Sequence, residues 1–349
     1  MHPQAWRVTG MTYVEKGSGV VWYLRDAQIR DLVTPEEANR VIEEVFLNQS
    51  NDQIVTRPTV ELTLPRSMLR VKVGADFAHG VYGFKAYPAG GRYLIVLYDI
   101  ETGLNAMVEG RQLTELRTGA VSAVGTKYMA RPDASTLGII GTGREARQQL
   151  TSTALVRTFE TVWCYSRDRE HRSTFAKEMS ERLGLEVIAA DSGKQCVEQA
   201  DVVTTITNAN EPVLMGEWLR EGTHINAVGA TTPDRRELDD AAVGRCGTIV
   251  VELKEGAMNE VGELIHASEM GMLDWDQVHE LHEVVSGTIS GRRSASEITL
   301  NDTVGVGAED VALAWFAVSK AREQGIGSEL DFEPPYNLGT RGVAGGSRP

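Results

Sequence analysis

The first 130 residues contain a helix start, a strand-rich stretch and a long helix, in that order. Thr34 is the expected N-cap of a helix within residues 31–46, because a proline follows it and Glu37 stands three residues after it. Between residues 68 and 99, runs rich in Val, Tyr and Ile alternate with Gly or Pro clusters, which predicts strands and a hairpin. Residues 111–130 predict a long helix that ends before a proline.

Beyond residue 132, strand-like and helix-like segments alternate. This order predicts a parallel sheet with right-handed crossovers, which is a doubly wound nucleotide-binding domain of the α/β class. Residues 287–305 are expected to be mostly loop, residues 308–324 to form the last helix, and the glycine-rich tail 337–349 to be mobile. The expected strands cover residues 136–140, 161–165, 201–206, 224–228 and 247–251.

A glycine-rich turn follows the first of these strands and opens a predicted helix. In a dinucleotide-binding turn, the first glycine permits the tight turn and the second lets the pyrophosphate approach the backbone. A small third residue keeps helix and strand close. The helix N-terminus then offers unpaired N–H groups and a favourable dipole to the phosphates. The expected cofactor contacts in this turn are Gly141, Thr142, Gly143, Arg144, Glu145 and Ala146.

The end of the second predicted strand indicates which nucleotide is bound. Ser166 and Arg167 stand where cofactors without a 2′-phosphate usually meet an acidic residue. A hydroxyl and a guanidinium suit a phosphate dianion, whereas a carboxylate repels it. The sequence therefore favours NADPH over NADH. The alternative is that Arg167 and Arg169 are solvated and that Asp168 binds the ribose.

Composition and charge exclude several classes of function. The 349 residues are 42% hydrophobic and 24% charged, as in ordinary globular proteins, and they suffice for two domains. The net charge of −14, without a Lys/Arg-rich block, argues against nucleic acid as a partner. The three cysteines lack Cys-x-x-Cys spacing, which fits a reducing compartment. Because neither an export signal nor a membrane-length apolar run is present, a cytoplasmic protein is expected.

Metal binding and nucleophilic hydrolysis are not expected. His279 and His282 lie about a helical turn apart, but no HExxH motif and no carboxylate–histidine cluster with ligand spacing accompanies them. No Gly-x-Ser-x-Gly turn accompanies a plausible triad, and Cys164 is expected to pack rather than react.

Three cations in the first 130 residues are candidates for binding an anionic substrate. Arg117 has apolar neighbours at helical spacing, so it either snorkels to solvent or is paired in a cleft. Lys85 has apolar neighbours on its strand, and an edge-strand lysine is the alternative. Arg57 precedes a proline, which extends its backbone, and taken alone it is a surface residue. If the three converge, they can bind a carboxylate and polarise a C=N bond.

Six segments, spread in order over about residues 30–328, carry a resemblance to known proteins. They are YDIETG, LTELRTGAVSAVGTKYMARPD, LGIIGTGREARQQL, GTHINAVGATTPDRRELDD, EVGEL and ITLNDTVGVGAEDVALAWFAVSKAREQGIG. In order and approximate spacing the chain resembles the ornithine cyclodeaminase/mu-crystallin family. This co-occurrence is far more specific than the glycine-rich turn alone.

The resemblance implies a homodimer with a discontinuous α+β domain for substrate binding and dimerisation, residues 1–130 plus 305–349. A doubly wound Rossmann NADP-binding domain, residues 131–304, is inserted in it. The resemblance also implies that Arg57, Lys85 and Arg117 hold the substrate carboxylate beside the nicotinamide. The match is close at Arg117 and looser at the other two.

One loop position separates activities within the family. Cyclodeaminases carry an aspartate just after the strand INAVG, where it acts on the substrate amine, whereas this chain has Thr231 there. Threonine cannot act as a carboxylate base. Together with Ser166 and Arg167, this loop resembles the mu-crystallin branch, whose activity is ketimine reduction with NADPH.

Further residues are expected near the cofactor because they end predicted strands or match family positions. Thr303 stands where the family usually has a serine near the nicotinamide. Ordinary strand threonines and loop caps are the alternative. The set consists of Thr205, Thr207, Val228, Gly229 and Thr303.

The expected function is NADPH-dependent reduction of an α-imino acid, of the pyrroline- or piperideine-2-carboxylate type, by hydride transfer to the C=N carbon. Arg57 and Arg117 clamp the carboxylate, Lys85 supplies positive potential, and Thr231 lies near the site. The alternatives are amino-acid or opine-type dehydrogenation, ornithine cyclodeamination, and cofactor-dependent binding without turnover.

Overall fold

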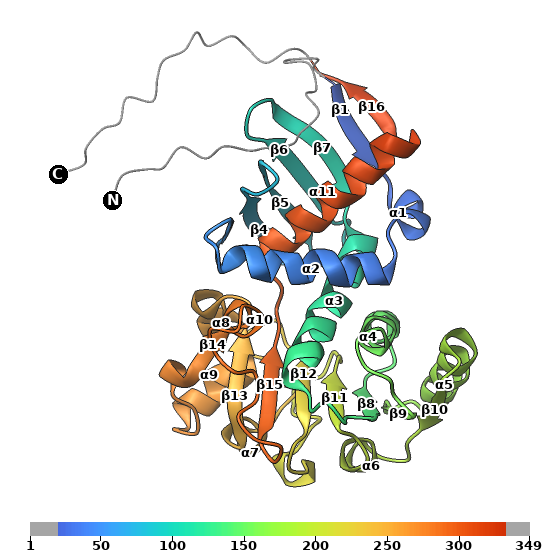
Figure 1. The fold of residues 1–349 in the computed structure, drawn as a ribbon, viewed down its shortest axis with the longest axis vertical. Helices are drawn as coiled ribbons and strands as arrows, with labels where there is room; N and C mark the ends of the chain where they lie inside the picture. The colour runs from blue at the N-terminus through green and yellow to red at the C-terminus, as the bar shows by residue number, and fades with distance from the viewer. Residues whose placement is uncertain (1–19, 333–349) are drawn as a thin grey trace, which may run out of the picture.

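The computed structural model describes residues 20–332, which form two α/β units, one above the other in Figure 1. The chain passes from the upper unit to the lower one through α3 (Arg111–Met129). It returns through the segment that joins β15 (Ile298–Asp302) to α11 (Gly307–Gln324). The tail 337–349, for which mobility is expected, lies outside the described residues.

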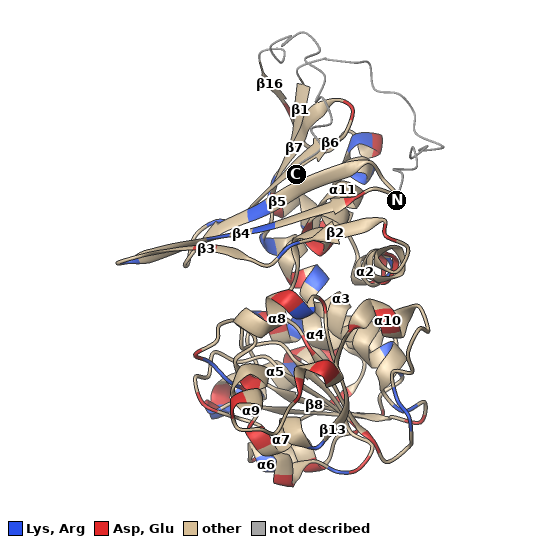
Figure 2. Cartoon of the chain, turned by 90° about the vertical axis from the view of Figure 1, so that its left-hand side faces the viewer, with Lys and Arg blue, Asp and Glu red and all other residues tan. Residues whose placement is uncertain are grey.

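The upper unit is built on a mixed sheet of strand order β16-β1-β7-β6-β5-β4-β2, with β3 also paired to β4. β1 and β7 run parallel, and β6 and β7 form the expected hairpin. Figure 2 shows that β3 and the adjoining end of β4 project from the rest of the sheet. The strands are β1 (Val20–Leu24), β2 (Ile54–Thr56), β3 (Val60–Leu64), β4 (Ser67–Asp76), β5 (Val81–Pro88), β6 (Leu94–Asp99), β7 (Gly103–Glu109) and β16 (Ser328–Asp331).

Helices cover one face of the mixed sheet. α11 lies directly on it, and α2 (Pro35–Gln49) packs against α11, while α1 (Asp26–Leu32) precedes α2. The predicted cap of α2 is confirmed, since the Glu37 N–H donates to the Thr34 hydroxyl and the Thr34 N–H donates to the Glu37 carboxylate.

The first turn of α11 approaches β4 very closely. It can do so because Gly74 has no side chain: a Cβ there would lie 2.3 Å from the backbone nitrogen of Ala308. The acidic residues at the start of α11 are thereby held over the middle of β4 and β5.

The lower unit is built on a parallel sheet of strand order β10-β9-β8-β11-β12-β15-β13-β14. The order reverses between β8 and β11, and ligands of open α/β sheets bind at the carboxyl ends of the strands beside such a switch point. Its strands are β8 (Thr136–Ile140), β9 (Thr161–Tyr165), β10 (Glu186–Ala189), β11 (Val202–Thr205), β12 (His224–Ala227), β13 (Cys246–Val251), β14 (Val278–Glu280) and β15. Its helices are α4 (Arg144–Ala154), α5 (Arg169–Leu183), α6 (Gly193–Glu198), α7 (Asp240–Gly244), α8 (Lys254–Glu260), α9 (Gly262–Glu269), α10 (Leu281–Val285) and the short 3-10 turns η1 (Gly216–Trp218) and η2 (Trp275–Gln277).

The expected fold class is confirmed: a Rossmann-type parallel sheet is inserted in a mixed α/β unit that the chain enters twice. The five predicted parallel strands are present, and none of their ends differs by more than one residue. The expectation of loop over residues 287–305 is wrong for Ile298–Asp302, which form the central strand β15 between β12 and β13. Sequence reasoning also missed β10 and β14.

The strand β15 was hidden by its polar sequence. All five of its residues are buried, and side chains of the neighbouring strand β12 bond to two of them. The Asn301 side chain donates to Asn226 at 3.0 Å, and Thr299 pairs with His224 at 2.9 Å. A buried strand with internal hydrogen bonds therefore carries residue types that are usual in loops.

Two glycines let α3 pack closely on the lower unit. A Cβ at Gly119 would lie 2.8 Å from the carbonyl oxygen of Gln148 in α4. A Cβ at Gly125 would lie 2.5 Å from the side-chain nitrogen of Asn301 in β15. The helix that joins the two units thus packs closely against α4 and β15 of the lower one.

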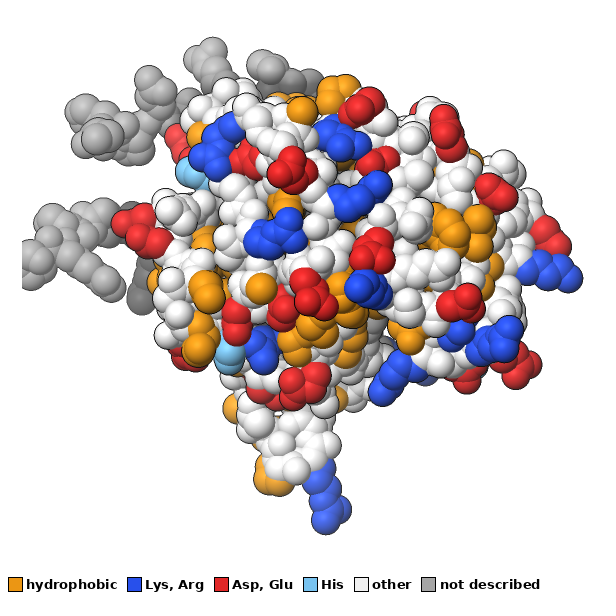
Figure 3. All heavy atoms as spheres, turned by 90° about the horizontal axis from the view of Figure 1, so that it is seen from below, with side chains coloured by type: hydrophobic (Ala, Val, Ile, Leu, Met, Phe, Trp, Pro, Cys, Tyr) orange, Lys and Arg blue, Asp and Glu red, His pale blue; other side chains and the backbone are white. Residues whose placement is uncertain are grey.

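The surface agrees with the absence of a basic block in the sequence. Figure 3 shows acidic and basic side chains interspersed over the lower end of the molecule, without a continuous basic patch on this face. Within residues 20–332, no helix has the length and apolar character needed to cross a membrane, and no group of three or more His, Cys, Asp or Glu side chains has metal-ligand geometry.

Candidate active site

The glycine-rich turn joins β8 to α4 at the switch point of the parallel sheet. Gly141 has φ +113°, and a Cβ there would lie 2.1 Å from the carbonyl oxygen of Ile206. At Gly143, by contrast, a Cβ would meet no atom within 4 Å, so the space in front of the turn is open. Ala146 is fully buried. These are the properties that a pyrophosphate needs in order to reach the backbone and the helix N-terminus.

Arg147 supports this turn, and sequence reasoning missed it. Its guanidinium donates to the carbonyl oxygens of Thr142 at 3.2 Å and Gly143 at 2.9 Å. The other side of the guanidinium is held by the Glu178 carboxylate at 2.5–3.0 Å. Tying the carbonyls back in this way leaves the N–H groups of the turn free to face a ligand. Of the remaining turn residues, Arg144 is exposed and forms an ion pair with Glu115, and Glu145 is half-buried.

The end of β9 presents a hydroxyl and a guanidinium beside the turn. The Thr142 hydroxyl donates to Ser166 at 2.8 Å, and the Ser166 hydroxyl donates to the carbonyl oxygen of Asp168 at 3.1 Å. Asp168 is the N-cap of α5, where its carboxylate accepts from the His171 N–H at 2.8 Å. Arg167 is exposed and forms no ion pair with another residue of the described range.

The next two strand ends are held together by one buried carboxylate. Glu237 accepts the N–H and the hydroxyl of Thr207, both at 2.6 Å, and the N–H of Gly229 at 2.7 Å. A Cβ at Gly229 would lie 2.5 Å from that carboxylate, so the position has room for glycine alone. The expected cofactor contacts Thr205 and Val228 lie on the same strand ends and are buried. Thr231, which is expected in the catalytic site, follows β12 and is half-buried.

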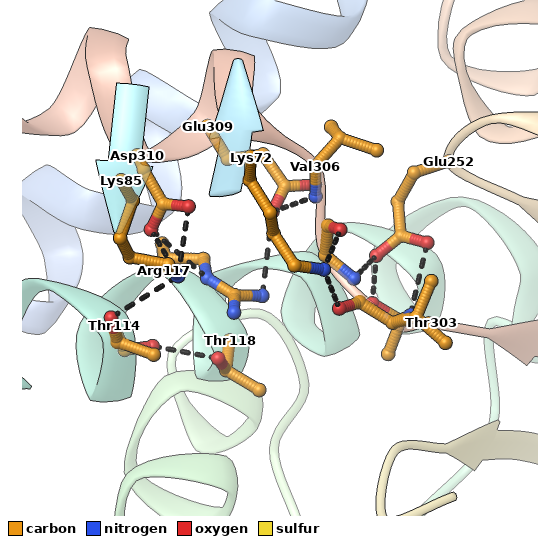
Figure 4. A network of polar contacts seen from close by, with 12 residues as sticks. Lys72, Lys85, Thr114, Arg117, Thr118, Glu252, Thr303, Val306, Glu309 and Asp310 are labelled. Atoms are coloured by element: carbon orange, nitrogen blue, oxygen red, sulfur yellow. Dashed lines mark hydrogen bonds and ion pairs between the residues drawn. The ribbon is translucent and has the colours of Figure 1, made fainter. Parts of the chain in front are cut away.

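Lys85 and Arg117 meet below the first turn of α11 (Figure 4). The Lys85 amine donates to one Asp310 oxygen at 2.8 Å and lies 2.8 Å from the other, and it also donates to the Thr114 hydroxyl at 3.4 Å. The Arg117 guanidinium lies 3.5 Å from Glu309 and 3.5 Å from Asp310. All four charged side chains are at most 7% exposed. The structure therefore brings together two of the three predicted substrate-binding cations.

Lys72 is a third cation in this cluster, and sequence reasoning missed it. It stands on β4 directly opposite Lys85 on β5. Its amine donates to the carbonyl oxygens of Val304 at 2.9 Å and Gly305 at 2.7 Å. Figure 4 shows its side chain running toward the Arg117 guanidinium. Every second residue of β4 from Arg70 onward is buried, Lys72 among them, but nothing in the sequence distinguishes this lysine from one that faces solvent.

Arg57 is not part of this cluster. It follows the last residue of β2, is exposed, and forms no ion pair or side-chain hydrogen bond within the described residues. Its contribution to substrate binding stays a prediction.

The loop between β15 and α11 is fixed by Glu252 at the end of β13. The Glu252 carboxylate accepts the Thr303 hydroxyl, the Val304 N–H at 3.2 Å and the Gly305 N–H at 2.9 Å. Thr303 is only 2% exposed, so in this structure its hydroxyl caps the loop, which was the alternative to contact with the cofactor. Gly305 has φ +76°, and a Cβ there would lie 2.1 Å from the Arg117 guanidinium.

Burial and mutual repulsion shift the protonation of these groups. Burial lowers the pKa of Lys85 to about 7, with Asp310 opposing the shift and Arg117 and Lys72 adding to it. Burial also lowers the pKa of Lys72. Burial raises the pKa of Glu309 to about 8, and the nearby Glu252 adds to that shift. Near neutral pH Glu309 is therefore mostly protonated and does not neutralise Arg117, which leaves the guanidinium charge available to an anion.

These features occur together with a match to one family. The family description for "Ornithine cyclodeaminase/mu-crystallin family" matches residues 26–325. The chain belongs to this family. The match covers both units of the fold, including α3, the glycine-rich turn and α11.

Members of the family with known names resemble the chain along most of its length. The iminosuccinate reductase of Paracoccus denitrificans is 35% identical over 320 residues, which are 88% of this chain and 98% of that protein. The Δ1-pyrroline-2-carboxylate reductase of Thermococcus litoralis, solved with NADH and L-proline, has a TM-score of 0.85 and 34% identity. That match covers 89% of this chain and 100% of the other. An archaeal alanine dehydrogenase dimer with bound NAD has a TM-score of 0.84 and 30% identity, covering 90% and 99% of the two chains.

Proposed function

We propose that this protein is an NADPH-dependent reductase of α-imino acids, which transfers a hydride to the carbon of a C=N bond. The observation that carries the proposal is the buried pair Lys85 and Arg117, which come from β5 of the mixed sheet and from α3, the helix that joins the two units. Hydride transfer to an anionic imino acid needs a cation that holds and orients the substrate carboxylate, and these two side chains can supply it. The named reductases among the relatives support the same reaction.

The residues of the chain bind and orient the substrate. Arg117 has several N–H donors that no described carboxylate accepts, including its buried Nε, so it can take up a substrate carboxylate. Lys85 adds positive potential beside carboxylate and imine, which stabilises the developing charge. Holding the imino acid by its carboxylate fixes which face of the C=N bond is presented. A dinucleotide bound by residues 141–146 would supply the hydride.

Thr231 separates this proposal from cyclodeamination. The residue lies after β12, where it is half-buried and where a cyclodeaminase would need a carboxylate. Without a base at that position, release of ammonia from ornithine lacks its proton acceptor. The role of Thr231 itself stays a prediction.

The preference for NADPH over NADH is supported by the end of β9. Asp168 uses its carboxylate to cap α5, and Arg167 is free of ion pairs with described residues. A free guanidinium beside Ser166 suits a 2′-phosphate. The dinucleotides in the related structures are NADH and NAD, which lack the 2′-phosphate, so the preference of this chain for NADPH rests on Ser166 and Arg167.

A homodimer is supported by the free side of the mixed sheet. Val60, Leu62 and Leu64 on the projecting strand β3 are 48–61% exposed, and Tyr82 stacks on Tyr98 at 5.3 Å while 42% exposed. Large exposed apolar patches mark interaction surfaces. We assign dimerisation and substrate binding to residues 1–130 plus 305–349 and the dinucleotide to residues 131–304. The alanine dehydrogenase relative is a dimer.

Oxidation of NADPH with purified protein tests the reaction. We expect turnover with preformed pyrroline- or piperideine-2-carboxylate, or with a 2-oxo acid plus ammonium, which forms the imine in solution. Arg117→Met is expected to lower kcat/KM by about 100-fold, since it removes a charge-assisted contact and its orientation. Arg182→Met, at an exposed position on α5, is the matched control and leaves kcat/KM unchanged.

Three outcomes would contradict the proposal. Binding of NADPH without its oxidation across this panel would indicate a binding protein. Formation of proline and ammonia from ornithine with catalytic cofactor would indicate a cyclodeaminase. Turnover that requires a primary amine larger than ammonia would indicate an opine-type dehydrogenase.

A further inference from the structure

Lys72 and Lys85 are two buried amines that repel each other when both are protonated. They are directly opposed across the antiparallel strands β4 and β5. Directly opposed residues have Cβ atoms about 5 Å apart, and like charges in such a pair are destabilising. Both side chains are at most 4% exposed, so water does not screen the repulsion. A second buried lysine at this place is costly unless a negative charge is brought to it.

The one carboxylate within ion-pair distance of Lys72 among the described residues is that of Glu260, and no carboxylate there accepts a hydrogen bond from its amine. Its amine has three donors, and the described residues accept two of them, through the carbonyl oxygens of Val304 and Gly305. Glu260 lies 3.9 Å away, beyond hydrogen-bond distance. The Glu260 oxygens already accept the N–H and the hydroxyl of Thr59, at 3.2 and 2.8 Å. Asp310, which neutralises Lys85, has no contact with Lys72 within 4 Å.

The amine of Lys72 nevertheless lies next to the substrate clamp. It bonds to the Gly305 carbonyl at 2.7 Å, and the same Gly305 is packed so closely against Arg117 that no Cβ fits between them. Figure 4 shows the ends of Lys72 and Arg117 near each other, with Lys85 on the other side of Arg117. The three cations thus form a row, of which Lys85 and Arg117 suffice for one carboxylate.

We propose that Lys72 binds a second carboxylate of the substrate, so that the enzyme acts on short acyclic α-imino dicarboxylates. The inference rests on the proposed function, because a second-carboxylate site has this meaning only in an imino-acid reductase. The α-carboxylate lies on Arg117 and Lys85, and the distal carboxylate accepts the remaining donor of Lys72. Because the Lys72 amine and the Arg117 guanidinium both lie against Gly305, the two carboxylates would lie close together, as they do in a short dicarboxylate.

Two other roles for Lys72 predict different behaviour. If it only braces the Val304–Gly305 loop, its loss affects all substrates equally. If it shares the α-carboxylate with Lys85, its loss again affects monocarboxylates and dicarboxylates alike. Only a distal-carboxylate site makes the effect depend on the second carboxylate.

Matched substrates separate these roles. Pyruvate plus ammonium and oxaloacetate plus ammonium give imines that differ only by the distal carboxylate, and 2-oxoglutarate plus ammonium lengthens the spacer. NADPH oxidation is followed for each, and for pyrroline-2-carboxylate, with the wild-type protein and Lys72→Met. We expect the wild type to prefer oxaloacetate, and Lys72→Met to raise KM for oxaloacetate by about 10- to 100-fold while changing KM for pyruvate by about twofold or less. Lys72→Arg retains the cation and is expected to recover part of the preference.

Two controls keep the result interpretable. Glu252→Gln weakens the same loop without removing a cation, so it is expected to affect the four substrates equally. If Lys72→Met has no turnover, calorimetric binding of succinate and butyrate to the NADP-loaded protein gives the same comparison, since these acids have similar shapes and differ by one carboxylate. Preferential loss of succinate binding supports the inference.

Failure of the inference is distinguishable from failure of the proposed function. An equal loss with pyruvate, pyrroline-2-carboxylate and oxaloacetate in Lys72→Met, or a wild type without preference for a dicarboxylate, would overturn the second-carboxylate site and leave the reductase intact. If no imino acid oxidises NADPH while succinate binding still depends on Lys72, the reaction is wrong and the anion site stands.

Discussion

At the scale of single residues, the protonation of the Lys85 amine is set by opposing effects of its surroundings. Burial and two neighbouring cations oppose its protonation, while Asp310 favours it, and the result is a pKa of about 7. The group is therefore positively charged below about pH 7 and neutral above it. An anionic ligand gains most from the charged form, so the affinity of the free enzyme for carboxylates is linked to this protonation.

Pyrrole-2-carboxylate tests this linkage, because its ring nitrogen does not titrate near neutral pH and its carboxylate stays ionised. We expect its inhibition constant to be lowest below about pH 7 and to rise by up to tenfold per pH unit above it, as Lys85 loses its proton. Ionisation of Glu309, whose pKa burial raises to about 8, acts in the same direction at higher pH. In Lys85→Arg, which stays charged, the rise that starts near pH 7 is expected to vanish. An unchanged profile in that variant would assign it to another group.

Arg167 is the residue that tests the cofactor. Arg167→Ala is expected to lower kcat/KM for NADPH by about tenfold and to leave that for NADH nearly unchanged, because only the 2′-phosphate requires the guanidinium. Arg169→Ala, at the exposed first residue of α5, is the neighbouring control. If the wild type has equal kcat/KM for NADPH and NADH, the role of Arg167 is contradicted and Asp168 is expected to bind the ribose.

At the scale of elements, the turn between β8 and α4 uses its two glycines for different purposes. Gly141 is required by the fold, since its φ is +113° and its neighbour Ile206 leaves no room for a Cβ. Gly143 has φ −77° and open space in front of it. The protein could accommodate alanine there, and only a ligand that approaches the backbone forbids it.

Alanine substitutions separate these purposes. Gly141→Ala is expected to reduce the free energy of unfolding by more than about 2 kcal/mol, because it adds both strain and overlap. Gly143→Ala is expected to leave the melting temperature unchanged and to weaken NADPH binding by about tenfold or more, measured by fluorescence titration. If Gly143→Ala binds NADPH as tightly as the wild type, the pyrophosphate does not lie against this turn.

The strand β15 offers a second test at this scale. Asn301 is fully buried, and its side chain donates to Asn226, which in turn donates to Thr126 of α3 at 2.9 Å. Asn301→Ala leaves buried partners unpaired and is expected to reduce the free energy of unfolding by about 1–3 kcal/mol in urea. Asn259→Ala, at an exposed position, serves as the control and should change it by less than about 0.5 kcal/mol.

The elements with the clearest local signals were predictable from the sequence. The capping box of α2, the long helix α3 and the apolar strands of the parallel sheet have patterns set by their own residues. β15 was missed because its polar side chains are satisfied only by strands distant in sequence. For the same reason Lys72 and Arg147 were not foreseen, since their roles depend on carbonyl groups of a distant loop or of a turn whose shape the sequence does not specify.

At the scale of the whole molecule, one side of the mixed sheet is covered by α11 and the other presents apolar side chains. Leu62 is 57% exposed on β3. Leu62→Asp is expected to convert the proposed dimer to monomers in analytical ultracentrifugation, because a charge cannot be buried unpaired in an apolar contact. Leu155→Asp, 51% exposed just beyond α4 in the lower unit, is the control and leaves the mass unchanged. A wild-type monomer at micromolar concentration would contradict the proposal.

The upper unit is built from two segments, one before and one after the parallel sheet, and this affects the order in which the chain can fold during synthesis. The parallel sheet is complete once residue 302 has left the ribosome, whereas β1 waits for β16, and Lys85 waits for its carboxylate on α11. The unit that is begun first is thus finished last, against the usual order in which nascent domains fold. Until the final segment emerges, the two opposed lysines and the uncovered sheet are what the nascent chain presents to chaperones.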